Sequence, residues 1–125
     1  MTIHKPTPEC CVDFAFQRIG GKYKGRIIYS IHVHGILRYG QLKKAISGIT
    51  PKMLTQTLRE LENDKLISRK VYVEVPPKVE YTLTESGRKL VPFIEYLKEW
   101  VEDLVASDPG HELHEQNELY GRQGR

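Results

Sequence analysis

Two stretches of alternating residues, separated by Pro76-Pro77, limit the folds open to this chain more than any other feature. In residues 67–75, three valines alternate with polar or aromatic side chains, and residues 79–84 repeat the pattern. A period of two is typical of β-strands, and adjoining prolines interrupt strand pairing. The sequence therefore predicts a β-hairpin whose turn contains the two prolines.

An amphipathic helix is predicted directly before this hairpin. Thr50 suits the N-cap, because its hydroxyl can accept a backbone N–H, and Pro51 suits the first helical position. Three leucines follow at helical spacing and share one face, namely Leu54, Leu58 and Leu61. The opposite face carries donors for phosphates or base edges, namely Lys52, Gln56, Arg59 and Asn63, with Thr55 on its flank. Alone, this pattern favours an ordinary solvated surface helix over a DNA-binding one.

Shorter elements precede this helix. Apolar spacing predicts helices over residues 10–19, 22–34 and 40–46, with a brief strand over 36–39. In the third of these helices we expect Leu42, Ala45 and Ile46 to face inward. The helix over 40–46, the tight turn after it and the helix from Pro51 have helix-turn-helix proportions. With the hairpin behind them, the order of elements is that of a winged helix, an α+β fold that is mainly helical.

The last predicted helix carries an apolar stripe too large for one small domain to cover. Thr84 caps this helix, Glu85 suits its first turn, and Pro92 should bend it or delay its regular part. The stripe predicts a two-fold dimer interface comprising Leu90, Phe93, Leu97, Trp100, Val101 and Leu104. Burial within a monomer is the alternative.

Composition and charge suggest one basic domain with an acidic end. Hydrophobic residues make up 39% and charged residues 28%, and no apolar run is long enough for a membrane helix, so we expect a cytoplasmic protein. Up to Pro92 the chain has 16 basic and 8 acidic residues; from Phe93 it has 3 and 8. The basic part points to a polyanionic partner. We expect a flexible arm over 1–9, the domain over 10–105 and a disordered acidic tail over 106–125.

Four segments together resemble the HxlR-type family of bacterial winged helix-turn-helix transcriptional regulators. They are GGKYK (20–24), RYGQL (38–42), ITPKMLTQTLRELE (49–62) and VEVPPKVEYTLTESG (73–87). Tyr23 stands where the family has Trp, and Cys11 where members commonly have Pro. The resemblance implies a homodimeric, sequence-specific DNA-binding regulator, dimerised through its first and last helices, which adds Phe14 of the first helix to the expected interface. We expect a repressor.

DNA contacts are expected from the helix after Thr50 and from the hairpin. The candidates on the helix are Thr50, Lys52, Thr55, Gln56 and Arg59. Arginine can pair bidentately with guanine and glutamine with adenine. On the hairpin and its flanks the candidates are Lys78 at the tip, Lys70 and Arg69 behind it, and Lys43, Lys44 and Arg38. A dimer would set two recognition helices about 34–36 Å apart, or a multiple of that, and predicts a pseudo-palindromic operator in double-stranded DNA.

Three alternatives accompany these expectations. The hairpin lysines could be merely solvated, and the winged helix could bind a protein instead of DNA. Cys10 and Cys11 begin the first helix, where the helix dipole favours a thiolate. The resembled family includes thiol sensors of oxidants and electrophiles, with the sensing cysteine at the position of Cys10, so sensing stands against a half-buried structural role. The effector, a small molecule or an oxidant, is left undefined.

Other chemistry finds little support in the residues. His32 and His34 are two positions apart on a predicted helix, a poor spacing for one metal, and no CxxC or HxxxH element occurs. No phosphate loop, catalytic triad or cofactor fingerprint is present. We therefore expect no metal, no cofactor, no membrane partner and no enzymatic activity.

Overall fold

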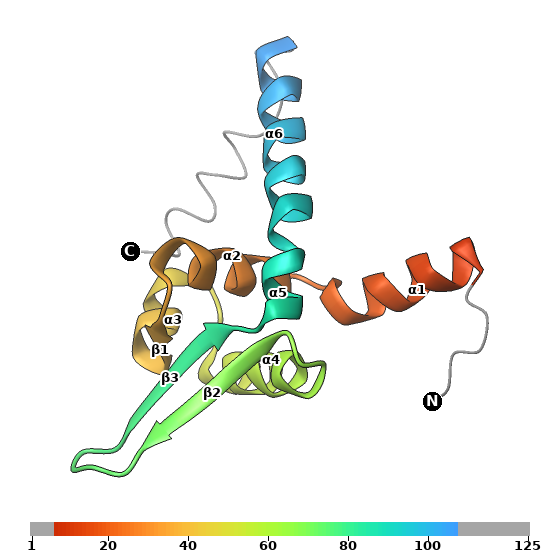
Figure 1. The fold of residues 1–125 in the computed structure, drawn as a ribbon. Coiled ribbons are helices and arrows are strands. Elements are labelled where there is room, and N and C mark those ends of the chain that lie inside the picture. The colour runs from red at the N-terminus through yellow and green to blue at the C-terminus, as the bar shows by residue number, and fades with distance from the viewer. Residues whose placement is uncertain (1–6, 108–125) are drawn as a thin grey trace.

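The computed structural model describes residues 7–107 (Figure 1). In chain order its elements are α1 (Pro8–Ile19), α2 (Lys24–His34), β1 (Leu37–Arg38), α3 (Tyr39–Ala45), α4 (Pro51–Asn63), β2 (Ile67–Tyr72), β3 (Lys78–Leu83), α5 (Glu85–Lys89) and α6 (Val91–Ser107). The order of elements and the mainly helical class agree with the predicted winged helix.

The sheet is small and antiparallel. Its strand order is β1-β3-β2, so β3 is the central strand. Leu37 pairs with Tyr81, and the β2–β3 ladder runs from Ile67 opposite Leu83 to Tyr72 opposite Lys78. Beyond that last pair, residues 73–77 form the turn, and the hairpin extends away from the helices (Figure 1). We call β2, β3 and this turn the wing.

The alternation over residues 67–75 was too long a prediction for β2. The strand ends at Tyr72, because β3 starts only at Lys78 and no partner backbone lies opposite the residues in between. Val73 and Val75 are consequently fully exposed in the turn, and Val71 is about half exposed.

The core lies between α2, α4 and the sheet. α2 contributes Ile27, Ile28 and Ile31, none of which is solvent-accessible. α4 contributes the three leucines predicted for its inner face, and Leu42 and Ile46 close the core from α3 and its C-cap. Ala45 is exposed, contrary to expectation: a seven-residue helix buries only a narrow stripe, and Ala45 lies outside it.

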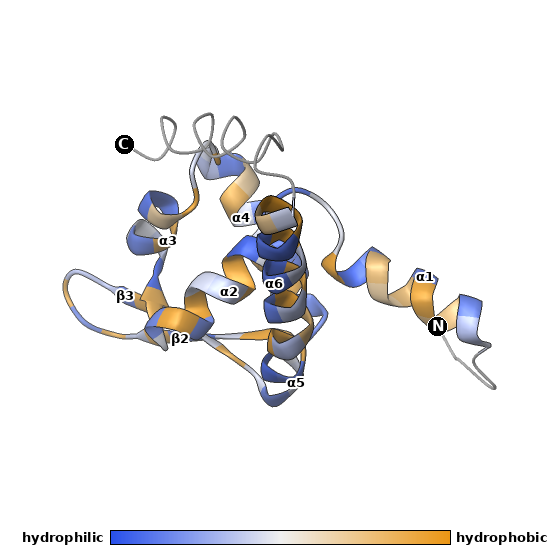
Figure 2. Cartoon of the chain, turned by 90° about the horizontal axis from the view of Figure 1, so that it is seen from above, coloured by the Kyte–Doolittle hydropathy of each residue, from blue (hydrophilic) through white to orange (hydrophobic). Residues whose placement is uncertain are grey.

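Both ends of the described chain are helices that extend from this body (Figure 1). α1 has no buried residue, and α6 buries only Val91. Hydrophobic residues nevertheless run along both helices (Figure 2), and Phe16, Phe93 and Trp100 are exposed. Within the described residues, Phe93, Leu97 and Trp100 of the stripe are therefore left exposed, whereas Leu90, Val101 and Leu104 are half-buried.

The helix boundaries follow from local interactions at their ends. α1 begins at Pro8, two residues before the prediction, because Thr7 Oγ1 accepts the Cys10 N–H at 3.1 Å. Residues 8 and 9 are thus helical, not part of an extended arm; residues 1–6 and 108–125 of the predicted arm and tail lie outside the described residues. The prediction for Pro92 is confirmed, since α5 ends before Leu90 and a separate helix begins at Val91.

Candidate nucleic-acid interface

α4 is anchored along one face and capped at its start. Leu54, Leu58 and Leu61 are at most 3% exposed. Thr50 Oγ1 accepts the Met53 N–H at 3.1 Å, which confirms the predicted N-cap. The opposite side presents four exposed side chains, which we call the recognition face: Lys52, Gln56, Arg59 and Asn63. Packing on one side thus holds donors toward solvent on the other.

Tyr39 fixes the angle between α3 and α4. Its hydroxyl donates to the Pro51 carbonyl at 3.0 Å and lies 3.2 Å from Thr55 Oγ1. Thr55, predicted as a DNA contact, is half-buried beside this hydroxyl. The sequence analysis did not single out Tyr39, although it lies in the RYGQL segment at the start of the first helix of the helix-turn-helix.

Gln56 is tied to a carboxylate beside the recognition face. Its Nε2 donates to Glu60 Oε2 at 2.8 Å, and Lys24 Nζ of α2 lies 3.2 Å from Glu60 Oε1. The hydrogen bond from Gln56, followed by that from Lys24, lowers the pKa of Glu60, so the side chain is ionised at neutral pH. The negative charge next to the recognition face is therefore balanced from within the chain.

Arg59 lies over a cavity of about 310 Å³ between α4 and the sheet. Thr55, Arg69 and Tyr81 line the same cavity. Three predicted DNA contacts, Thr55, Arg59 and Arg69, therefore come together there. Arg69 Nε lies 3.6 Å from Glu62 Oε1, which joins the wing to α4. Burial raises the pKa of Tyr81, which keeps its hydroxyl protonated beneath these arginines.

Lys78 does not lie in the turn at the tip of the wing, as the sequence had suggested, but in the last ladder pair before that turn. It pairs with Tyr72 at the start of β3, its Nζ lies 4.3 Å from the Tyr72 ring centroid, and Glu80 Oε2 is 3.9 Å away. Lys70 Nζ lies 4.9 Å from the same ring. The turn needs residues 73–77 to reverse direction, and this length moves Lys78 back into the ladder.

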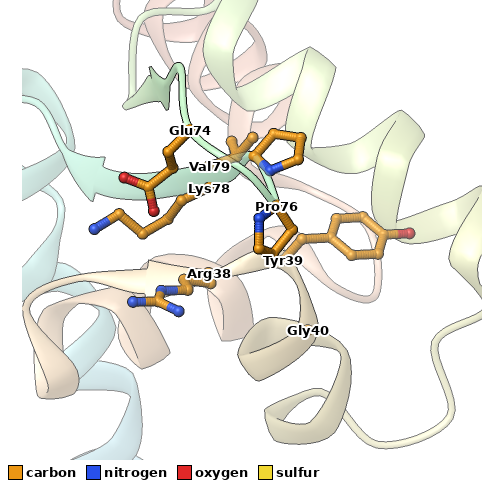
Figure 3. A pocket seen from close by; sticks show the side chains of 8 residues that line it. Arg38, Tyr39, Gly40, Glu74, Pro76, Lys78 and Val79 are labelled. Carbon is orange, nitrogen blue, oxygen red and sulfur yellow. The ribbon is translucent and has the colours of Figure 1, made fainter.

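Between the wing and α3 lies a cavity of about 470 Å³. Figure 3 shows the side chains of Arg38, Lys78 and Glu74 extending to one side of it, with Tyr39 on the other. Lys43, half-buried, and Lys44, exposed, follow on α3. Of the predicted cations, Arg38 and Lys78 thus line this cavity together with the carboxylate of Glu74, whereas Lys43 and Lys44 are not among its lining residues.

Comparison with known proteins accounts for this arrangement. Residues 18–109 match the family described as HxlR-like helix-turn-helix. The chain belongs to the HxlR-like family. The match includes every element from α2 to α6, and with them the recognition face and the wing.

Three relatives of this HxlR-family chain illustrate the match. It is 47% identical over 98 residues to the HTH-type transcriptional regulator YybR of Bacillus subtilis, covering 78% of each chain. It is also similar to the redox regulator HypR in its oxidised form, at 47% identity and a TM-score of 0.70, covering 75% of this chain and 96% of HypR. The reduced transcriptional regulator YodB of B. subtilis matches at 32% identity and a TM-score of 0.68, covering 86% and 100%.

The residues predicted for dimerisation divide into two groups in this HxlR-family member. Phe93, Leu97 and Trp100 are exposed, whereas Val101 and Leu104 are half-buried. Leu90 packs against the core and so does not belong to the exposed part of the stripe. The guanidinium carbon of Arg18 lies over the Phe14 ring, 3.7 Å from the centroid of that ring. An apolar groove of about 490 Å³ runs beside the stripe and is lined by Phe16, Ile19, Phe93 and Leu97, among others.

Both cysteines are exposed on the first turns of α1, so neither has the half-buried position of a structural cysteine within the chain. The described residues contain no cluster of three or more His, Cys, Asp or Glu side chains that could hold a metal ion. Nor does any helix among them have the length and apolarity needed to cross a membrane.

Proposed function

We propose that this HxlR-family protein is a sequence-specific, DNA-binding transcriptional regulator that acts as a homodimer and represses its target. One observation carries the proposal most directly: α4 buries its leucines and directs Lys52, Gln56 and Arg59 outward. A helix fits the major groove, where the base edges carry a distinct pattern of donors and acceptors. Family membership supports the same conclusion.

The wing, β1 and α4 supply the charge for contacts with the DNA backbone in this proposal. Arg38 and Lys78 line one cavity, and Arg59 and Arg69 line the next one. Each phosphate that these cations neutralise adds about 0.9 to the slope of log K against log salt concentration. Binding is therefore expected to weaken steeply as salt rises. Since the proposed partner is the chromosome, we expect the protein to work in the cytoplasm and to have no enzymatic activity.

A second copy of the chain best explains the exposed stripe of α6. Phe93, Leu97 and Trp100 are 37–53% exposed, and Phe16 of α1 is 57% exposed. Two-fold packing would remove this surface from water and pair two recognition faces for a pseudo-palindromic operator. Light scattering coupled to gel filtration tests this step, and a monomer at micromolar concentration would refute it.

The test of DNA binding is a salt-dependent gel shift on the DNA upstream of the gene for this protein. Arg59→Ala is expected to weaken binding by about 5- to 150-fold, as for loss of a base or charged phosphate contact. The matched control is Lys89→Ala, which removes one exposed charge from α5. α5 follows the end of β3 that is remote from the turn of the wing. Binding without sequence preference at physiological salt would instead favour the alternative, a protein-interaction module.

Thiol sensing is a second candidate function, favoured by the exposure of Cys10 and Cys11 on α1. Arg18 Nε lies 3.4 Å from Asp64 Oδ1, so the far end of α1 is joined to the end of α4. Peroxide would oxidise a thiolate to a sulfenic acid, and condensation with a thiol of the second chain would form a disulfide and release water. A shift of α1 would then be transmitted to α4 through the contact between Arg18 and Asp64.

Single and double Cys→Ser variants test the sensing proposal. Peroxide or a quinone is expected to change the DNA affinity of the parent but not that of Cys10→Ser, with Cys11→Ser as the matched comparison. An equal response in Cys10→Ser and the parent would refute a sensing role for Cys10.

A further inference from the structure

Gln56 stands out on the recognition face because its amide has a defined orientation. Its Nε2 lies 2.8 Å from Glu60 Oε2. An ionised carboxylate only accepts hydrogen bonds, so the amide nitrogen must face Glu60 and the amide oxygen must point elsewhere. The flipped amide would set two acceptors against each other.

Lys24 holds Glu60 in the arrangement that makes this orientation persist. Its Nζ lies 3.2 Å from Glu60 Oε1, the oxygen that Gln56 does not use. The Lys24 side chain is 13% exposed and starts α2, so the contact joins a largely covered cation to α4. Lys24 also neutralises a carboxylate that would otherwise repel phosphates next to the recognition face.

The oriented amide has a definite set of groups left for a base. One amide hydrogen is used by Glu60, which leaves one N–H donor and the carbonyl acceptor of Gln56. In the major groove, adenine presents the N7 acceptor beside the N6 amino donor, whereas guanine presents two acceptors, N7 and O6. The oriented amide matches adenine, and against guanine its carbonyl would face O6.

We propose that Lys24 and Glu60 are positioning residues that orient Gln56 to read adenine and to reject guanine. The inference rests on the proposed function, DNA binding through α4, and deepens it by naming one base and the two residues behind its reader. Glu60 and Lys24 need not touch DNA themselves.

Selection of DNA from a randomised pool, followed by sequencing, tests the inference with the full-length protein. The parent is expected to prefer adenine to guanine by about tenfold or more at one position of each half-site. Gln56→Ala identifies this position by abolishing that preference. Glu60→Gln lets the amide of Gln56 turn over, so the adenine-to-guanine ratio should fall to about twofold or less while overall affinity is kept or raised.

Two further comparisons separate orientation from charge. Glu62→Gln makes the same charge change on the same helix, but Glu62 contacts Arg69 instead of Gln56, so the ratio should stay as in the parent. Lys24→Arg should keep the ratio and Lys24→Met should lower it. Thermal melts establish that each variant is folded.

Three results would overturn the inference: a motif unchanged by Gln56→Ala, an unchanged ratio in Glu60→Gln, or an equal fall in Glu62→Gln. A parent protein that selects no motif at all would refute the proposed function itself. A parent that selects a motif insensitive to Gln56→Ala would refute only the inference about Gln56.

Discussion

At the junction between the wing and α5, we expect Gly87→Ala to destabilise the fold, although helix propensity alone would favour alanine over glycine. Gly87 lies buried in α5, and a Cβ added there would overlap the carbonyl oxygen of Leu66 and lie 3.1 Å from its carbonyl carbon. That oxygen has little freedom to move, because it accepts the Thr84 N–H at 3.1 Å. Thr84 Oγ1 in turn donates to the Lys65 carbonyl at 2.6 Å and accepts the Gly87 N–H at 3.0 Å.

The size of the effect follows from two opposing contributions. Replacing glycine by alanine in a helix stabilises it by up to about 1 kcal/mol. Overpacking against a well-held neighbour costs about 1–3 kcal/mol, and a fixed backbone carbonyl places Gly87→Ala near the upper end. We expect a net loss of about 2 kcal/mol in the free energy of unfolding. For a domain of this size, that loss lowers Tm by about 8–16 °C.

Thermal unfolding followed by circular dichroism, at matched protein concentration, measures the difference. The control is Gly40→Ala in the first turn of α3, where an added Cβ meets no atom within 4 Å outside its chain neighbours and the backbone of its own helix. Gly40→Ala should melt at or slightly above the parent. If Gly87→Ala also melts at or above the parent, the argument from the Leu66 carbonyl is wrong.

Three further predictions concern α4. Leu61→Ala, at a fully buried position, should cost about 2–5 kcal/mol in urea unfolding, and a loss below 1 kcal/mol would contradict the packing described. Thr50→Ala removes the cap on Met53 N and should cost about 0.5–2 kcal/mol by the same measurement, whereas Thr50→Ser should stay close to the parent. The pKa of Glu60 is lowered by folding, so its stabilisation is complete above the ordinary pKa of a glutamate and is lost as pH falls through the lowered one. The Tm advantage of the parent over Glu60→Gln should accordingly shrink between about pH 7 and pH 3, and a constant difference would refute it.

Periodicity predicted most of the fold, because helices and strands bury their side chains at distinct spacings. The leucines of α4 and the alternation in β3 needed no long-range information. The end of β2 could not be predicted without long-range information, since a strand extends only as far as its partner strand. Val73 and Val75 have no partner backbone opposite them. The prediction that placed Lys78 at the tip was wrong for the same reason, because strand pairing sets the length of the turn.

The candidate site divides along the same line. The outward donors of α4 follow from helical spacing, and the contact of Gln56 with Glu60 is four residues apart, within reach of a sequence rule. The ion pair from Lys24 to Glu60 joins two helices distant in the chain, and the hydrogen bonds of Tyr39 join α3 to the following helix, α4. Only the folded structure brings those groups together.

The central position of β3 has a mechanical consequence. β3 pairs with both other strands, starts directly after the turn of the wing and ends at Leu83, with Thr84 alone separating it from α5. In a two-fold assembly held through α6, the strand therefore works as a strut between the symmetry axis and the DNA. In that assembly, only Leu90 between α6 and α5 and Thr84 between α5 and β3 would separate the subunit contact from the strand that carries the wing.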